Sequence, residues 1–314
     1  MKINKKIRHM LLIGTGAVGG LYGGKIAQTG VRVTALCRSD YAVVKKKGIE
    51  VSSIWGDFHF RPERVIRRAG ELQEAPDLIL VALKVLPEID APGLIREAVG
   101  PDTAIALLQN GVEIEKTMAD AFPENEIISG LSFVCASRTA RGKIHHLDYG
   151  RLVFGNYPSG ISRKVRELCR LFRSVGVPCK DSRDIVRERW KKLVWNAPFN
   201  PLSVLGGGIT TREIMESREM ARLAREIMKE VRSVARAVGH ALPLAIVEAN
   251  IQDTLRMKPY KTSMCLDFEA GRPLEVEGIL GNAARAARRE RVAVPRLETL
   301  YALLAVVDRN NRKK

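Results

Sequence analysis

The sequence has 314 residues, enough for two domains with separate hydrophobic cores. Hydrophobic residues make up 46% and charged residues 28%, as in soluble globular proteins, and no apolar run reaches the roughly 20 residues of a membrane-spanning helix. The net charge of +17 would allow nucleic-acid binding, but the aromatic residues (5%) do not interleave with the basic clusters as a stacking platform would, so we do not expect a nucleic-acid partner.

The cysteines and the clusters of basic residues indicate the cellular compartment and the kind of ligand to expect. Five cysteines without CxxC spacing favour reduced thiols in the cytoplasm over a disulfide framework or a zinc site. We therefore expect a cytoplasmic protein without a bound metal. Basic residues gather in four segments, 45–47, 61–68, 285–291 and 309–314. Such segments are more often solvated faces, which also attract anionic ligands.

The first predicted element is a strand at residues 8–13, which leads into a glycine-rich loop of the form GxGxxG. A helix is predicted at 17–29 and a second strand at 31–37, which together make a βαβ unit. In such units the first glycine allows a tight turn, the second lets backbone reach a pyrophosphate, and the third permits close helix packing. The helix N-terminus adds amides and partial positive charge for the phosphates. The dinucleotide-binding residues predicted in this loop are Gly14, Thr15, Gly16, Ala17, Val18 and Gly19.

The end of the second strand distinguishes NAD from NADP. A carboxylate there would bind the ribose 2′-hydroxyl, whereas an arginine accommodates a 2′-phosphate. The sequence places Arg38 at this point, which predicts NADP, with an ordinary surface arginine as the alternative. Asp40 is better explained as the cap of a helix that begins near Tyr41.

Two further buried strands are predicted at 77–83 and 104–108, and they are followed by Lys84 and by Asn110. Ligands of open α/β sheets bind beyond the carboxyl ends of the strands, so both side chains should point toward the same crevice. The remaining strands are expected at one edge of the sheet, at 127–134, 143–147 and 151–154.

From residue 181 onward the pattern is helical, and the segment 190–205 is apolar around most of a helix, which predicts burial. Its polar residues recur at i, i+4, i+8 and i+11 and form one narrow stripe. The stripe consists of Lys192, Asn196, Asn200 and Ser203. Buried amides and ammonium groups need partners, which could be other side chains or a ligand lying along the stripe. Further helices are predicted at 211–238, 244–257, 277–290 and 296–309.

Five landmarks follow one another in a specific order and spacing. They are GTGAVGG at 14–20, Lys84 after its strand, LLQNGV at 107–112, K-x3-N-x3-NPL at 192–202, and TSM…D…GRPLEVEGILG at 262–281. With these landmarks the chain resembles ketopantoate reductases (2-dehydropantoate 2-reductases) over essentially its whole length. We therefore predict an α/β fold, with a Rossmann-type dinucleotide-binding domain at 1–184, an all-helical substrate domain at 185–314 and the active site in the cleft between them.

The resemblance implies roles for the catalytic and substrate-binding residues. Lys192 resembles the catalytic lysine, which donates a proton to the alkoxide as hydride arrives. Glu275 resembles the carboxylate that anchors the substrate and orients this lysine. Asn196 and Asn200 match the asparagines that hold the 2-keto acid, and Ser263 matches the ligand of the substrate carboxylate. Taken alone, Glu275 could equally be a helix-start glutamate and Ser263 an N-cap.

The cofactor residues follow in the same way. Asn110 matches the asparagine between nicotinamide ribose and substrate, and Arg38 and Lys84 match residues on the 2′-phosphate side of NADPH. The implied activity is NADPH-dependent reduction of 2-dehydropantoate to (R)-pantoate, on the route to pantothenate and coenzyme A.

Two other functions are weighed beside this one. The first is an NADP-linked reductase of another 2-keto acid on the same scaffold. The second is a Rossmann-type NADPH-binding regulator that contacts nucleic acid through the basic clusters, and it leaves the polar stripe unexplained. A small-molecule keto acid is the expected partner, no membrane is expected, and a homodimer is left open.

Overall fold

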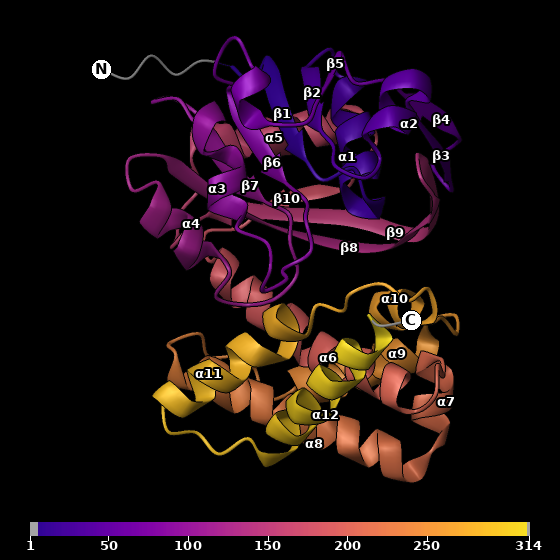
Figure 1. Ribbon diagram of the computed structural model, residues 1–314. Helices are drawn as coiled ribbons and strands as arrows, with labels where there is room; N and C mark the ends of the chain where they lie inside the picture. Colours follow the sequence, from indigo (N-terminus) through magenta and orange to yellow (C-terminus); the bar gives the residue numbers. More distant parts are fainter. Residues whose placement is uncertain (1–5, 313–314) are drawn as a thin grey trace. The chain divides into compact units, whose positions relative to one another are not determined.

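The structure of the protein is a computed structural model that describes residues 6–312 (Figure 1). The last two residues of the basic segment 309–314 lie outside the described residues. By their internal contacts the residues form two compact units, which we call the sheet unit and the helical unit. The sheet unit comprises the chain up to Lys84, Ile89–Gln109 and Glu115–Ile185. The helical unit comprises Val85–Glu88, Asn110–Ile114 and the chain from Val186 onward.

The sheet unit is built on one ten-stranded mixed sheet. Its strands are β1 (His9–Ile13), β2 (Arg32–Leu36), β3 (Ile49–Ser53), β4 (Phe58–Phe60), β5 (Arg64–Ile66), β6 (Leu78–Val81), β7 (Ala104–Leu107), β8 (Glu126–Ala140), β9 (Lys143–Asn156) and β10 (Cys179–Asp181). The order is β4-β3-β9-β8-β7-β6-β1-β2-β5, and β10 pairs with β9. From β5 to β8 every neighbouring pair is parallel, whereas β8 and β9 are antiparallel.

The register of the parallel strands aligns their carboxyl ends. Ile13 of β1 lies opposite Leu36 of β2 and Val81 of β6, and Val81 lies opposite Leu107 of β7. The apolar runs of β1, β6 and β7 are buried throughout, as expected for parallel strands covered on both faces. The loops after these strands therefore start at the same edge of the sheet.

The strands expected at one edge of the sheet differ from the prediction, because β8 and β9 lie inside the sheet and β3 and β4 form that edge. Two short strands were predicted at 143–147 and 151–154, but the chain forms one strand, β9, which runs through both. The residues between the two predicted strands form a β-bulge and not a turn. Tyr149 and Gly150 have positive φ, and β9 stays paired with β8 on both sides of them. No strand was predicted at β3, β4 or β5, which are only three to five residues long.

Helices and turns cover this sheet (Figure 1). They are α1 (Ala17–Ala27), α2 (Tyr41–Lys47), α3 (Ala91–Ile95), α4 (Glu115–Ala121), α5 (Arg163–Ser174) and the 3-10 turns Ala69–Glu71 and Arg96–Ala98. The core of the unit includes Leu12, Tyr22, Phe154 and Phe172, and the ring of Phe172 packs edge-on against Tyr22 and stacks with Phe154.

The helical unit contains the remaining helices. They are α6 (Ile185–Leu205), α7 (Thr211–Glu216), α8 (Arg218–Ala237), α9 (Ile246–Arg256), α10 (Ser263–Glu269), the π-helical turn η3 (Glu277–Gly281), α11 (Asn282–Arg289) and α12 (Pro295–Asn311). Residues of α6, α8, α11 and α12 share one core, and α12 packs against α8 (Figure 1). None of the helices within residues 6–312 is long and apolar enough to cross a membrane.

Two helix predictions need correction. The segment 211–238 is not one helix, because Ser217 is extended and its hydroxyl accepts the amide of Met220, which caps α8. The predicted helix at 277–290 begins as the π-helical turn and becomes α-helical at Asn282. The predicted class, an α/β part followed by a helical part, is confirmed.

Candidate active site

The glycine-rich loop of the sheet unit is tightly packed at its two ends and open in the middle. Gly14 has φ of 92°, and a Cβ there would lie 2.8 Å from Leu83 Cδ2 and 3.1 Å from the Ala82 carbonyl oxygen. A Cβ on Gly19 would lie 1.9 Å from the carbonyl oxygen of Gly14, so α1 can approach the loop this closely only with glycine. Around Gly16 no described atom would lie within 4 Å of a Cβ. The open side of the loop can therefore receive a ligand against its backbone.

The N-terminus of α1 begins at this open position. Gly16 is the N-cap, and no side chain of the described residues caps the helix. The first amides of a helix have no intrahelical partner, so those of α1 can donate to an anion. The first turn also contains no acidic residue that would repel a phosphate.

Thr15 and Cys37 lie beside this loop. The Thr15 hydroxyl is 3.5 Å from the Cys37 sulfur, and both residues are buried. Burial raises the pKa of the Cys37 thiol, so this sulfur stays protonated near neutral pH. The pair therefore adds no charge to the floor of the loop.

Arg38 follows β2 at the same edge of the sheet. Its side chain is exposed and makes no hydrogen bond or ion pair with any residue between 6 and 312. Asp40, two residues later, is 3% exposed and accepts a 2.7 Å hydrogen bond from Arg138 Nη1. We expected Asp40 to cap α2, and it does occupy the N-cap position, but its carboxylate pairs with Arg138 and makes no capping bond. Since Asp40 is neutralised elsewhere, Arg38 keeps its charge available for an anion.

Lys84 lies three residues beyond Val81, the end of β6, and is the last residue of its stretch of the sheet unit. Because β1 and β6 are in register, Lys84 and the glycine-rich loop both follow strands that end at the same edge. The Lys84 side chain is half-buried.

The polar stripe of the helical unit lies on α6. From Leu193 onward the helix is apolar apart from the stripe, and Trp190 and Phe199 are fully buried. It contains Pro198 and Pro201, which each remove one backbone hydrogen bond. Packing of its apolar surface must therefore hold this helix, since its own hydrogen bonding is incomplete.

Two buried amides of the stripe are unused. Asn196 is 8% exposed and Asn200 is 3% exposed, and neither side chain makes a hydrogen bond with another residue described by the structure. The side-chain atoms of these two residues are also not among the fully buried polar atoms without a partner, so they still reach solvent. A buried amide without a partner is costly, typically about 1–3 kcal/mol. Amides that reach solvent from a buried helix are suited to hydrogen bonding with a ligand.

Lys192, the first residue of the stripe, belongs to a chain of hydrogen bonds. Its Nζ donates to Asn110 Oδ1 at 2.8 Å, and Asn110 Nδ2 donates to Glu275 Oε2 at 3.1 Å. The second carboxylate oxygen of Glu275 accepts the backbone amide of Val85 at 3.3 Å. All four residues belong to the helical unit. These two partners fix the orientation of the Asn110 amide, because its oxygen must face the lysine and its nitrogen must face the carboxylate.

The short segment that carries Asn110 is held against the π-helical turn by close backbone contact. Gly111 has φ of 105°, and a Cβ there would lie 2.1 Å from the carbonyl oxygen of Gly278. The Val112 amide donates to the same oxygen at 3.3 Å. A Cβ on Gly278 would lie 3.0 Å from Val85 Cβ and 3.2 Å from the Asn110 carbonyl oxygen. The two glycines therefore let three parts of the unit meet beside Glu275.

Side chains of three other residues bind the same segment, 110–114. Arg189 Nη1 donates to the Gly111 carbonyl at 3.1 Å, and Asn282 Nδ2 donates to the Val112 carbonyl at 2.7 Å. Arg289 pairs with Glu113 at 2.6 Å. These contacts leave the segment little freedom, so Asn110 is positioned by its own backbone.

The π-helical turn begins two residues after Glu275. Its Glu277 accepts a 2.6 Å hydrogen bond from the Tyr301 hydroxyl and a 2.8 Å bond from Arg285. The bond to Glu277 raises the pKa of Tyr301. Such π-turns occur often at functional sites, and this one aims Glu275 and presents the Gly278 carbonyl to the neighbouring segment.

Ser203, the last residue of the stripe, and Ser263 of α10 differ in their surroundings. Ser203 is fully buried and its hydroxyl lies 2.6 Å from the Thr262 hydroxyl, which is the N-cap of α10. Ser203 therefore connects α6 to α10. Ser263 is the first residue of α10, is exposed, and makes no hydrogen bond with the rest of chain 6–312, so its hydroxyl is available to a ligand.

Sequence reasoning did not single out the residues that support Asn110 and Glu275. They are Val85, Arg189, Gly111, Gly278 and Glu277. Gly111 lies in LLQNGV, and Gly278 and Glu277 lie in GRPLEVEGILG, so the signal was present in the landmarks as unexplained glycines and carboxylates. Within residues 6–312 no three His, Cys, Asp or Glu side chains gather as metal ligands.

Comparison with known proteins gives concordant matches. The family model for ketopantoate reductase PanE/ApbA matches residues 10–159, and the model for its C-terminal part matches residues 184–308. A 2-dehydropantoate 2-reductase of Nostoc sp. is 36% identical over 97% of each chain. The crystal structure of a 2-dehydropantoate 2-reductase from Methylococcus capsulatus has a TM-score of 0.91 at 50% identity and covers 98% of each chain. A second, from Geobacter metallireducens, has a TM-score of 0.89 at 36% identity, over 95% of this chain and 99% of that chain.

Proposed function

The chain belongs to the ketopantoate reductase family of oxidoreductases, and we propose that it reduces 2-dehydropantoate to (R)-pantoate with NADPH, on the route to pantothenate and coenzyme A. The observation that carries this proposal is the hydrogen-bonded chain from Lys192 through Asn110 to Glu275. It joins a proton donor, Lys192, to a carboxylate. Lys192 lies on α6, and the next two residues of the stripe, Asn196 and Asn200, have amides that make no hydrogen bond with the described residues.

The sheet unit fits a phosphorylated dinucleotide. The open backbone at Gly16 and the uncapped start of α1 would hold the pyrophosphate, and Arg38 would hold the 2′-phosphate. Lys84 follows β6 at the same edge and would add a second positive charge. When bound, the dinucleotide supplies the hydride for the reduction.

The helical unit fits a 2-keto acid. Asn196 and Asn200 would donate to its carboxylate and keto oxygens without adding charge, and the Ser263 hydroxyl would bind the carboxylate. As the keto carbon is reduced, the Lys192 ammonium gives one proton to the developing alkoxide oxygen and becomes a neutral amine, which solvent then reprotonates. Asn110 holds the lysine in place during this step, and Glu275 holds Asn110.

Reduction of a different 2-keto acid is the second candidate. The polar residues named above would bind the keto-acid group, which all 2-keto acids share. None of them is assigned to the side chain by which one 2-keto acid differs from another. A substrate panel separates the two candidates. NADPH oxidation is followed at its own absorbance with 2-dehydropantoate and with keto acids that have shorter, longer or aromatic side chains. The proposal predicts the highest kcat/KM for 2-dehydropantoate, and a higher value for another member of the panel would reassign the substrate.

A further inference from the structure

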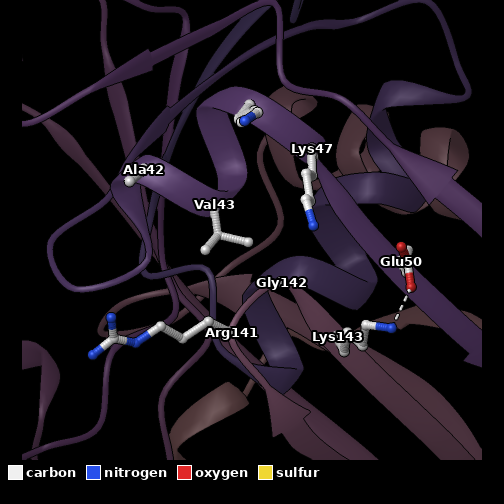
Figure 2. Close-up of a pocket in the computed structure, with 9 residues that line it drawn as sticks. Ala42, Val43, Lys47, Glu50, Arg141, Gly142 and Lys143 are labelled. Carbon is white, nitrogen blue, oxygen red and sulfur yellow. Dashed lines mark ion pairs between the residues drawn. The ribbon is translucent and has the colours of Figure 1, made fainter.

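A basic pocket lies in the sheet unit, on residues that the proposed function does not use. It has a volume of about 410 Å³ and is formed by α2, the start of β3 and the turn between β8 and β9. In Figure 2 the side chains of Val43 and Lys47 extend from α2 toward Gly142, with Glu50 and Lys143 on one side and Arg141 on the other. Its volume is within the range of roughly 300–1,000 Å³ found for small-molecule sites.

The lining of this pocket is strongly positive. Four of its side chains are cationic, Lys46, Lys47, Arg141 and Lys143, and the only carboxylate among them is Glu50. Glu50 pairs with Lys143 at 3.1 Å. The side chains of the other three cations make no ion pair or hydrogen bond with any residue of 6–312. Three cations without a partner among the described residues therefore belong to the lining of one hollow, and the side chain of Arg141 extends outward from it (Figure 2).

The dipole of α2 explains only part of this arrangement. Lysines in the last turn of a helix are favoured by its partial negative charge, which accounts for Lys46 and Lys47. It does not account for Arg141 and Lys143, which come from the turn between β8 and β9 and from the start of β9. Like charges that are brought near one another by separate elements repel, so the helix dipole alone does not explain this lining.

The basic segment 285–291 shows the contrast. Its Arg285 pairs with Glu277 at 2.8 Å, Arg288 with Glu298 at 2.8 Å and Arg289 with Glu113 at 2.6 Å. Three of the four arginines on that segment are therefore paired with carboxylates. Around the pocket, only Lys143 of the four cations has such a partner among the described residues.

We propose that this pocket binds a small anion that bears phosphate groups. Uncompensated cations around a hollow attract a multivalent anion, and its phosphate oxygens can accept hydrogen bonds from lysine and arginine side chains of the lining. Ala42 and Val43 add an apolar wall, which would also accept the carbon part of an organic phosphate. Arg38, which precedes α2, is not among the residues that line the pocket.

The test uses the full-length protein and isothermal titration at fixed ionic strength. Two probes distinguish the sources of phosphate, tripolyphosphate for inorganic anions and 1-naphthyl phosphate for organic ones. Binding of either probe should weaken about tenfold or more in the double variant Lys47→Ala, Arg141→Ala, since two charge-assisted contacts are lost. The matched control is Lys180→Ala, an exposed lysine of β10 outside the pocket, which should bind like the unchanged protein.

Further binding measurements distinguish the pocket from the proposed dinucleotide site. Binding should persist in Arg38→Ala and in the presence of excess NADPH, and the Arg38 arm stays informative even if the proposed cofactor is wrong. Loss of binding in either arm would assign the probe to the dinucleotide site and overturn the proposal. An equal loss in Lys180→Ala would reduce the effect to net charge, and no binding of either probe at millimolar concentration would also overturn it. A short DNA oligonucleotide that binds the pocket more tightly than both probes would reassign it to nucleic acid.

Discussion

The candidate ligand-binding groups of the two units differ in how far they are fixed by contacts within the protein. In the sheet unit, Arg38 is exposed and has no ion-pair partner among residues 6–312, and the open backbone at Gly16 has no described neighbour within 4 Å of a Cβ position. In the helical unit, Lys192, Asn110 and Glu275 are already joined by hydrogen bonds of 2.8 and 3.1 Å. The first unit presents charge and backbone amides to a ligand, whereas the second fixes the direction of each functional group beforehand.

This difference follows from what each task requires. A phosphate is attracted over a distance and tolerates small displacements of a flexible arginine. Proton transfer requires donor and acceptor within hydrogen-bond distance, and a misplacement of about 1 Å can cost a factor of about 10² in rate. We therefore expect substitutions in the helical unit to lower turnover, and substitutions in the sheet unit to lower cofactor affinity.

The largest expected effect is that of Lys192→Ala. If Lys192 is the general acid, kcat should fall by about 10²–10⁴, the usual contribution of acid catalysis. NADPH affinity should be unchanged, since the proposed phosphate contacts belong to the sheet unit. Steady-state kinetics and a fluorescence titration with NADPH measure the two quantities.

The control for this experiment is the neighbouring Lys191. It is displaced by about 100° on the helix. It pairs with Glu188 at 2.5 Å and its side chain is 33% exposed. Lys191→Ala should therefore be nearly silent. Loss of turnover in Lys191→Ala together with native turnover in Lys192→Ala would mean that the stripe has a different register, and the roles of Asn196 and Asn200 would be wrong as well.

Glu275→Ala should have the next largest effect. Without the carboxylate, Asn110 loses the acceptor that orients its amide, and Val85 loses its backbone contact. We expect kcat/KM to fall by about 10², the scale for a misplaced catalytic group, with a nearly unchanged Tm. Glu275→Gln keeps an oxygen that can accept from Asn110, so it should recover part of the activity. Native kinetics in a folded Glu275→Ala protein would remove this carboxylate from the site.

Gly278→Ala tests whether the backbone contact positions Asn110. The added Cβ would lie 3.0 Å from Val85 Cβ and 3.2 Å from the Asn110 carbonyl oxygen, so one of the three chain segments must shift. Overpacking of this kind costs about 1–3 kcal/mol of stability. We expect a lower Tm and a lower kcat with little change in NADPH affinity. A variant that loses stability but keeps its kcat would show that the contact serves the fold alone.

The fold and the site were predictable to different depths for a physical reason. The glycine-rich loop and the apolar strands β1, β6 and β7 have local signals, which identified the α/β class without knowledge of distant contacts. The break at Ser217 and the π-helical turn at Glu277–Gly281 depend on capping and on packing partners, and periodicity does not reveal them.

The same limit applies to the functional side chains. Spacing on one helix was enough to predict that Lys192, Asn196 and Asn200 share a face. It could not give the hydrogen-bond partner of Lys192, because Asn110 is 82 residues away, nor that of Asn110, because Glu275 is 165 residues further on. Asp40 illustrates the reverse case, in which a local rule predicted a cap but a distant arginine, Arg138, takes the carboxylate.

Arg38→Ala should produce the smallest change in turnover and a selective change in cofactor affinity. A charge-assisted contact with phosphate is worth about 1–3 kcal/mol, so NADPH should bind about 5- to 150-fold more weakly. NADH lacks the 2′-phosphate, and its affinity should change much less. The measurement is a pair of titrations with the two cofactors on the same variant.

Arg32 provides the matched control for Arg38. It lies at the amino end of the same strand, β2, and pairs with Glu74 at 2.5 Å and Glu63 at 3.8 Å, so its charge is already balanced. Arg32→Ala removes the same charge from the sheet unit but should leave NADPH affinity unchanged. Equal losses for NADPH and NADH in Arg38→Ala would show that Arg38 does not read the 2′-phosphate. The sheet unit would then have to recognise its cofactor through the glycine-rich loop and Lys84, without the exposed arginine on which the contrast with the helical unit depends.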